Sequence, residues 1–244
     1  MLLLTDFLCR FGWGLSLALV LTPARLVPAG FFRVNLLVVL GLATLAALLE
    51  WTSPSGTLVE RAWLVPAVAA VGAWLGSIAW LAERSRPGIV LCVVCALWLA
   101  AATCMLHSES LEQGVSALLS GLVVGLTVHA MLLGHWYLNA PGMRVDALRR
   151  MIDSALAAWF LQAAVVLISL ALATATPIRP ANPATLAMVS LRWLAGLVGL
   201  PILLLLSRKT LDIPNTQSAT GILYVACLAA IVGELAAQLL QAGP

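Results

Sequence analysis

Long apolar runs, separated by short polar or proline-rich breaks, recur along the whole chain. Because a helix of about 20 apolar residues crosses the hydrocarbon core of a bilayer, each run predicts a membrane-spanning helix. We therefore expect an all-α, polytopic integral membrane bundle. Its expected spans are residues 2–21, 34–51, 62–82, 88–106, 114–138, 155–176, 185–207 and 220–240.

The composition excludes a water-soluble protein. Hydrophobic residues make up 62% of the chain and charged residues only 9%, and the mean hydropathy is +1.05, far from the values of soluble domains. The 244 residues are used up by the expected helices and their short connections, so we expect a single transmembrane domain. Basic residues exceed acidic ones by only 13 to 10, which gives no nucleic-acid-binding footprint.

The basic residues of the connections are unevenly distributed. The second, fourth and sixth connections hold only Arg61 and Arg179. The first, third, fifth and seventh hold all the others, which are Arg25, Arg33, Arg84, Arg86, Arg144, Arg149, Arg150, Arg208 and Lys209. Since cytoplasmic loops are enriched in Lys and Arg, both termini should be extracytoplasmic. The arginine-rich basic set and a first segment without signal-peptide features favour a multi-pass protein of a bacterial inner membrane.

Residues 121–150 are the chemically richest segment, since they place two histidines in an apolar helix. Ionisable side chains at this depth usually face a bundle interior, a cavity or a cofactor. Gly121, Gly125 and His129 follow one another at i, i+4, which predicts a close helix contact along that row. His135 lies about 240° further round the helix at roughly 100° per residue, so the two imidazoles need separate partners.

These histidines suggest a cofactor in the cytoplasmic half. A quinone needs only a hydrogen bond from His129, His135, Tyr137 or Tyr224 and an apolar slot, and the two tyrosines lie near the same expected level. Haem is less easily held, because bis-histidine ligation needs two imidazoles at one depth and the third histidine, His107, falls in an external connection. The sequence favours a membrane subunit of a redox or respiratory-type assembly, with a quinone or haem-like cofactor and other membrane subunits as partners.

A second set of polar residues lies in the expected outer half. Arg192 and Glu234 are each roughly 10 Å from the outer end of adjacent helices, with Arg10 near that level. An unpaired charge there costs about 2.5–3.5 kcal/mol, so Arg192 is predicted to pair with Glu234. Pro201 should also bend or unwind its helix toward the cytoplasmic half. These features favour the alternative function, a small-solute or ion- or proton-coupled transporter, or else a structural or assembly subunit whose charges only clamp helices.

Two further groups of residues have simpler explanations. Cys92 and Cys95 share a helix face and could form a soft-metal site beside the histidines, or could be core. A cytoplasmic group could hold an anion or lipid headgroup near the polar segment 214–221, or could reflect only membrane orientation. This group consists of Arg149, Arg150, Arg208 and Lys209.

Charge spacing also predicts the start of the sixth helix. Asp146 with Arg150, and Arg149 with Asp153, are spaced as i, i+4 pairs, so the helix should begin before the membrane. No nucleotide-binding, metalloprotease or hydrolase motif is present, and no motif indicates that the isolated chain is an enzyme. No internal repeat is visible, but a diverged four-plus-four arrangement remains open.

Overall fold

The computed structural model describes residues 2–52, 62–108, 110–140, 142–173, 182–213 and 215–242, and these contain helices and no strands. The helices are α1 (Leu2–Leu21), α2 (Ala29–Trp51), α3 (Leu64–Leu81), α4 (Ser85–Leu106), α5 (Leu111–Asn139), α6 (Asp146–Ala173), α7 (Pro183–Leu191), the π-helix η1 (Arg192–Gly199), α8 (Leu200–Thr210) and α9 (Thr216–Ala242). Since α7, η1 and α8 form one continuous rod, the described residues contain 8 helical segments long and apolar enough to cross a membrane. The chain is therefore an all-α, multi-pass membrane bundle.

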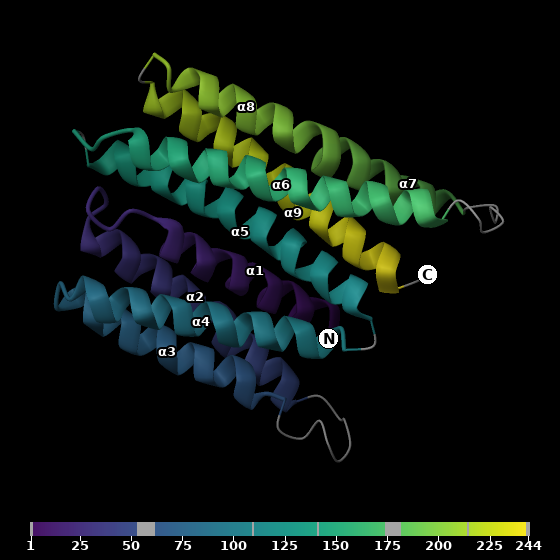
Figure 1. Cartoon of the computed structure of the whole chain (residues 1–244), viewed down its shortest axis with the longest axis horizontal. Coiled ribbons are helices and arrows are strands. Elements are labelled where there is room, and N and C mark those ends of the chain that lie inside the picture. Colours follow the sequence, from purple (N-terminus) through teal and green to yellow (C-terminus); the bar gives the residue numbers. More distant parts are fainter. Residues whose placement is uncertain are drawn as a thin grey trace.

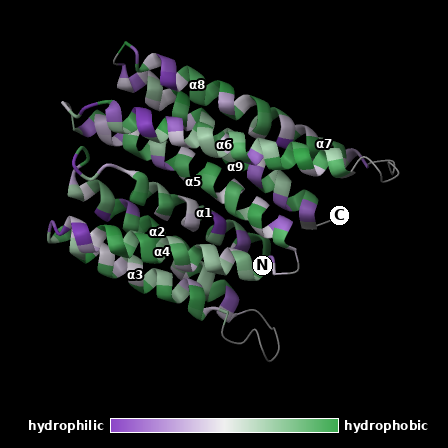
Figure 2. Ribbon diagram, in the orientation of Figure 1, coloured by the Kyte–Doolittle hydropathy of each residue, from purple (hydrophilic) through white to green (hydrophobic). Residues whose placement is uncertain are grey.

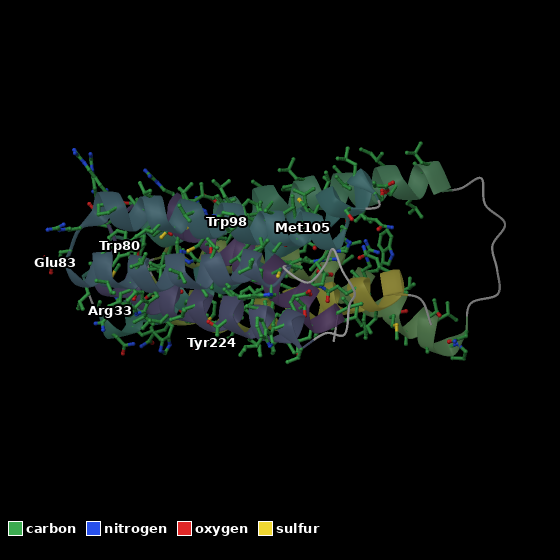
Figure 3. The ribbon with its side chains drawn as sticks, turned by 90° about the horizontal axis from the view of Figure 1, so that it is seen from below. Arg33, Trp80, Glu83, Trp98, Met105 and Tyr224 are labelled. Carbon is green, nitrogen blue, oxygen red and sulfur yellow. The ribbon has the colours of Figure 1, made fainter. Side chains whose placement is uncertain are left out.

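The alternation of connections agrees with eight crossings. In Figure 1 the connections after α1, α3, α5 and α8 lie at one end of the bundle, and both termini lie near the other. Figure 3 shows Arg33 and Glu83 at the first end, and Figure 2 shows hydrophilic residues on α6 and α8 there. We call this end inner and the end with the termini outer, following the arginine distribution. Arg61 and Arg179 lie outside the described residues, as do positions 174–176 of the expected sixth span.

The helices form two rings of four. In the first half α1 packs against α2, α2 against α3, α3 against α4, and α4 back against α1. In the second half α5 packs against α6, α6 against α8, α8 against α9, and α9 back against α5. The same order of contacts in both halves is the arrangement expected of a diverged four-plus-four repeat, and the two rings meet mainly where α1 lies along α5.

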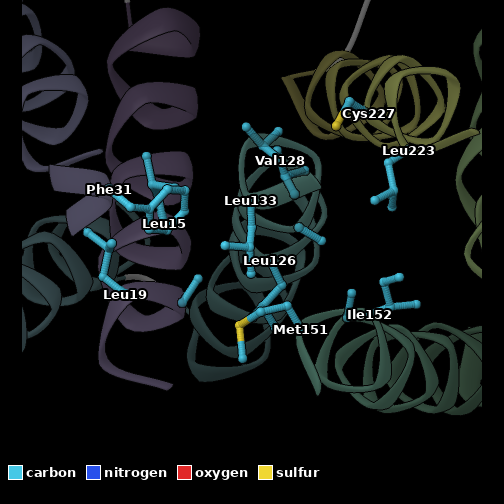
Figure 4. Close-up of a cluster of buried hydrophobic side chains, with 14 of the residues drawn as sticks. Leu15, Leu19, Phe31, Leu126, Val128, Leu133, Met151, Ile152, Leu223 and Cys227 are labelled. Atoms are coloured by element: carbon cyan, nitrogen blue, oxygen red, sulfur yellow. The ribbon is translucent and has the colours of Figure 1, made fainter. Parts of the chain in front are cut away.

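Glycines allow α1 and α5 to pack closely. A Cβ on Gly14 would overlap the backbone at Gly121, and one on Gly125 would overlap the backbone of Gly14 and Leu15. The helices therefore touch backbone to backbone, as the glycine row predicted. Figure 4 shows buried side chains beside this contact, including Leu15 of α1 and Leu126 of α5. The contact fixes the position of every polar side chain that α1 carries into the bundle.

The rod formed by α7, η1 and α8 is irregular just before Pro201. Leu200 donates its backbone N–H to the carbonyl of Ala195, five residues back, which is the hydrogen bond of a π-helix. Proline lacks an N–H and its ring crowds the carbonyl four residues earlier, so a wider turn relieves the clash. The expected distortion thus takes the form of η1, on the outer side of Pro201.

Candidate functional site

A buried charge cluster occupies the outer half of the bundle. Arg10 of α1 is 2% exposed and forms ion pairs with Glu234 of α9 at 2.8 Å and with Asp6 at 2.6 Å. Its guanidinium also lies 3.4 Å from the hydroxyl of Ser120 in α5. We call Asp6, Arg10, Glu234 and His107 the charge cluster. It links α1, α9 and the end of α4 at a depth where charges need partners.

His107 completes the cluster from the residue that follows α4. Its Nε2 lies 2.8 Å from Nη2 of Arg10 and 3.0 Å from Oδ1 of Asp6. The nitrogen can accept from Arg10 only when it carries no hydrogen, and can donate to Asp6 only when it does. Gln238 adds a hydrogen bond from Nε2 to Asp6 at 3.3 Å. Nε2 of His107 can therefore accept from Arg10 in one tautomer or donate to Asp6 in the other.

The expected ion pair between Arg192 and Glu234 is wrong. Glu234 pairs with Arg10 instead, and no ion pair of Arg192 is found among the described residues. The reason is the close contact of α1 with α5, which brings Arg10 beside α9. Arg192, partly buried on η1, lines a cavity that Glu234 also lines. The two side chains therefore share a site without forming a salt bridge.

Two adjoining cavities lie next to the charge cluster. The inner cavity, ≈30 Å³, is lined by Ser120, Gln162, Arg192 and Glu234 among others, and its volume suits roughly one or two water molecules. The outer cavity, ≈410 Å³, lies between α5, α6, η1 and the end of α9. Arg192 and Val166 line both and so stand between them. A third cavity, ≈220 Å³, reaches the charge cluster at Asp6 and His107.

The π-helix positions Arg192 over these cavities. Gly196 of η1 and Gly233 of α9 approach so closely that a Cβ on Gly233 would lie 2.7 Å from the Cα of Gly196. The carbonyl of Gly196 accepts a hydrogen bond from the Trp159 indole of α6 at 3.1 Å. These contacts hold α6, η1 and α9 together at the inner cavity, which Gly196 and Gly233 also line.

The expected cofactor ligands do not converge. His129 is fully buried, with its Nε2 2.6 Å from the hydroxyl of Thr22 and its ring 5.2 Å from that of Phe31. Tyr137 is also buried, and its hydroxyl donates to the carbonyl of Arg144. His129 thus faces α1 and α2, whereas Tyr137 is hydrogen-bonded to the connection after α5. The two side chains therefore do not line a common cofactor site.

His135 and Tyr224 form a separate pair on the surface of the bundle. The Tyr224 hydroxyl lies 3.1 Å from Nδ1 of His135, and both residues are exposed. Figure 3 shows Tyr224 at the edge of the bundle. In a membrane protein this surface faces lipid, so the pair is accessible from the bilayer.

The two cysteines face away from the histidines. Cys92 and Cys95 are free and buried, and the thiol of Cys95 donates to the carbonyl of Ala69 in α3 at 3.4 Å. The described part of the chain contains no group of three His, Cys, Asp or Glu residues suited to a metal ion. Of the two alternatives, the contacts of Cys95 agree with a position in the core, because its thiol turns to α3 and packs near Gly72.

The basic group at the inner end, expected to be cytoplasmic, is partly neutralised by acidic residues. Arg208 pairs with Asp153 at 2.8 Å, and Arg149 contacts the carbonyl of Leu211 and, at 3.5 Å, Asp212. Arg150 and Lys209 are exposed.

The expected i, i+4 pairs at this end are also wrong. Asp146 pairs with Arg144 at 2.8 Å, and Asp153 with Arg208 of the neighbouring rod. The helix start they indicated is nevertheless confirmed, because α6 begins at Asp146. Asn215 accepts a hydrogen bond from the Ser218 N–H and so caps α9.

Several members of the site were missed by the sequence reasoning. Asp6 was not identified from the sequence, and His107 was considered only as a residue of an external connection. Ser120 and Gln238 drew no attention, although polar side chains on helix faces that carry Gly121 or Glu234 were an available signal. Comparisons of the chain with protein-family models, with curated proteins and with solved structures give no match.

Proposed function

We propose that the chain is a proton-coupled transporter of a small solute in a bacterial inner membrane. The observation that carries this proposal is the position of Glu234. It is 4% exposed and paired with Arg10, yet it lines a water-sized cavity that adjoins the outer cavity at Arg192. A simple clamp between helices needs no such cavity.

The charges of the cluster support a role in holding a proton. With a neutral His107, the carboxylates of Asp6 and Glu234 exceed the single guanidinium of Arg10 by one negative charge. Uptake of one proton by Glu234 would neutralise the charge cluster and leave the guanidinium of Arg192, across the inner cavity, without a counter-charge. Because net charge inside a membrane is costly, binding of a proton should be coupled to the arrangement of α1 and α9. Arg192 faces Glu234 across the inner cavity and is the remaining charge there.

The test is proton movement in liposomes that contain the purified protein and an internal pH dye. Acetate, inorganic phosphate, glutamate and methylammonium serve as probes. We expect at least one probe to drive protein-dependent acidification, and Glu234→Gln to reduce it to the level of protein-free liposomes. Glutamine keeps the size and the oxygen that faces Arg10, so the helix contact is retained.

The matched control for this variant is Glu83→Gln, which changes an exposed carboxylate at the inner end. It should leave the acidification rate unchanged. Wild-type rates in the Glu234→Gln protein, or no acidification with any of the four probes, would contradict the proposal.

A second candidate function, a quinone-binding redox subunit working with other membrane subunits, is favoured by the surface pair of His135 and Tyr224. A hydroxyl and an imidazole in contact, exposed toward lipid in the inner half, suit the carbonyl of a quinone head group. Mass spectrometry of organic extracts should then show a bound quinone that falls about fivefold when Tyr224→Phe removes one hydrogen bond. Extracts containing only ordinary lipid would exclude this candidate.

A further inference from the structure

The outer cavity contains a positively charged side chain, the guanidinium of Arg192, where it adjoins the inner cavity. Arg192 lines it, together with the polar side chains Ser116, Ser169 and Gln241. Glu234, the nearest buried carboxylate, is already paired with Arg10. A guanidinium in a membrane-spanning segment without an ion pair among the described residues is costly. Apart from Glu112, whose carboxylate accepts a hydrogen bond from Ser169, no carboxylate of the described residues lines this cavity, so a molecule that enters it can supply the negative charge beside Arg192.

A second feature near the outer cavity is that α6 and α7 lie apart. In the first ring α2 and α3 pack against each other, but in the second ring α6 packs against α8, while α7 packs against α9. Figure 3 shows the outer ends of α6 and α7 lying apart. Trp159 closes the inner half by its hydrogen bond to Gly196, so the separation is confined to the outer half.

The residues that α6 and η1 contribute to the outer cavity are mainly apolar, whereas those from α5 and α9 are polar. Leu170 and Trp193 line the outer cavity and are 51% and 37% exposed, a surface that faces lipid in the membrane. Glu112, in the first turn of α5, also lines the outer cavity. Its carboxylate accepts a hydrogen bond from Ser169 at 2.5 Å. The base of the cavity therefore carries positive charge, while its side is open to apolar chains.

We propose that the outer cavity binds an anionic head group, a carboxylate or phosphate, through the guanidinium of Arg192. Arginine is suited to this role because its planar fork of N–H donors matches two oxygens of such a group. The hydroxyl of Ser116 and the amide of Gln241 supply further hydrogen bonds. This inference rests on the proposed transport function and names the class of its substrate. The anion comes either from a membrane amphiphile entering between α6 and α7 or from a free solute.

The experiment measures equilibrium binding to the protein in nanodiscs of neutral phosphatidylcholine, at one pH and without a gradient. Radiolabelled dodecanoate and acetate form one matched pair of probes, and dodecyl phosphate and inorganic phosphate form another. Each pair shares a head group and differs in its chain. We expect saturable binding of at least one probe. Preference for the dodecyl member indicates a membrane amphiphile, and equal binding of both members indicates a free anion.

The variant Arg192→Gln should weaken this binding roughly ten- to hundredfold, as expected for the loss of a charge-assisted hydrogen-bonding group. Arg192→Lys, which keeps the charge but loses the fork, should weaken it less. Ser116→Phe, which fills the cavity without changing any charge, should also weaken it. Arg150→Gln, at the exposed inner surface, is the matched control and should bind as the wild type does.

Wild-type affinity in both Arg192→Gln and Ser116→Phe would overturn the inference, as would binding of all four probes no greater than that of empty nanodiscs. The failure of this inference is distinguishable from failure of the proposed function. Absence of binding with proton movement that still depends on Glu234 removes only the anion site. Binding that depends on Arg192, without any such proton movement, removes only the transport function.

Discussion

Gly125→Leu should destabilise the bundle by about 3 kcal/mol or more. A Cβ at Gly125 would already overlap the backbone of Gly14 and Leu15. Since the clash is with backbone, no change of rotamer can relieve it, and α1 and α5 must move apart. Unfolding in mixed micelles of increasing dodecyl sulfate content, followed by tryptophan fluorescence, measures the loss.

Gly41→Leu is the matched control for this substitution. Gly41 lies on α2, where an added Cβ meets no atom within 4 Å. The same change should therefore alter stability by no more than about 0.5 kcal/mol. Equal losses for the two variants would show that the contact of α1 with α5 is not the critical packing of the fold.

Arg10→Met should destabilise the protein by about 3–5 kcal/mol, because it leaves the carboxylates of Asp6 and Glu234 buried without their cation. The same unfolding assay measures this loss. The additional changes Asp6→Asn and Glu234→Gln remove the uncompensated charges, so the triple variant should regain much of the stability. That recovery separates an electrostatic penalty from the loss of the arginine's packing.

Arg25→Met is the control for the arginine variant, since Arg25 is exposed at the inner end. It should change stability by no more than about 0.5 kcal/mol. A triple variant no more stable than Arg10→Met alone would contradict the electrostatic account of the cluster.

The helices and their order of crossing were predictable because each depends on a local run of about 20 apolar residues. The close contact of α1 with α5 was partly predictable from the spacing of Gly121 and Gly125. The partner of Glu234 was not. Arg192 was favoured because its helix is adjacent in the chain, whereas Arg10 is 224 positions away. Which arginine lies beside Glu234 depends on how the two rings of helices pack against each other, and no local sequence pattern encodes that packing.

The separation of the histidines had a similar cause. Their spacing predicted correctly that His129 and His135 face different ways, and the structure gives them Thr22 and Tyr224 as partners. A shared cofactor slot would have required Tyr137 and Tyr224 to turn toward one of them. Depth along a helix was predictable, but the direction of a side chain depends on which helices surround it.

The wide turns of η1 make the number of residues in this segment as important as their identity. A π turn holds about one more residue than an α turn. Deleting one residue between Arg192 and Gly199 would let the rod revert to α-helix and rotate α7 by about 100° against α8. The guanidinium would then leave both cavities although the arginine is still present. Such a deletion would remove the guanidinium from the site although no residue of the site is replaced and the segment stays helical.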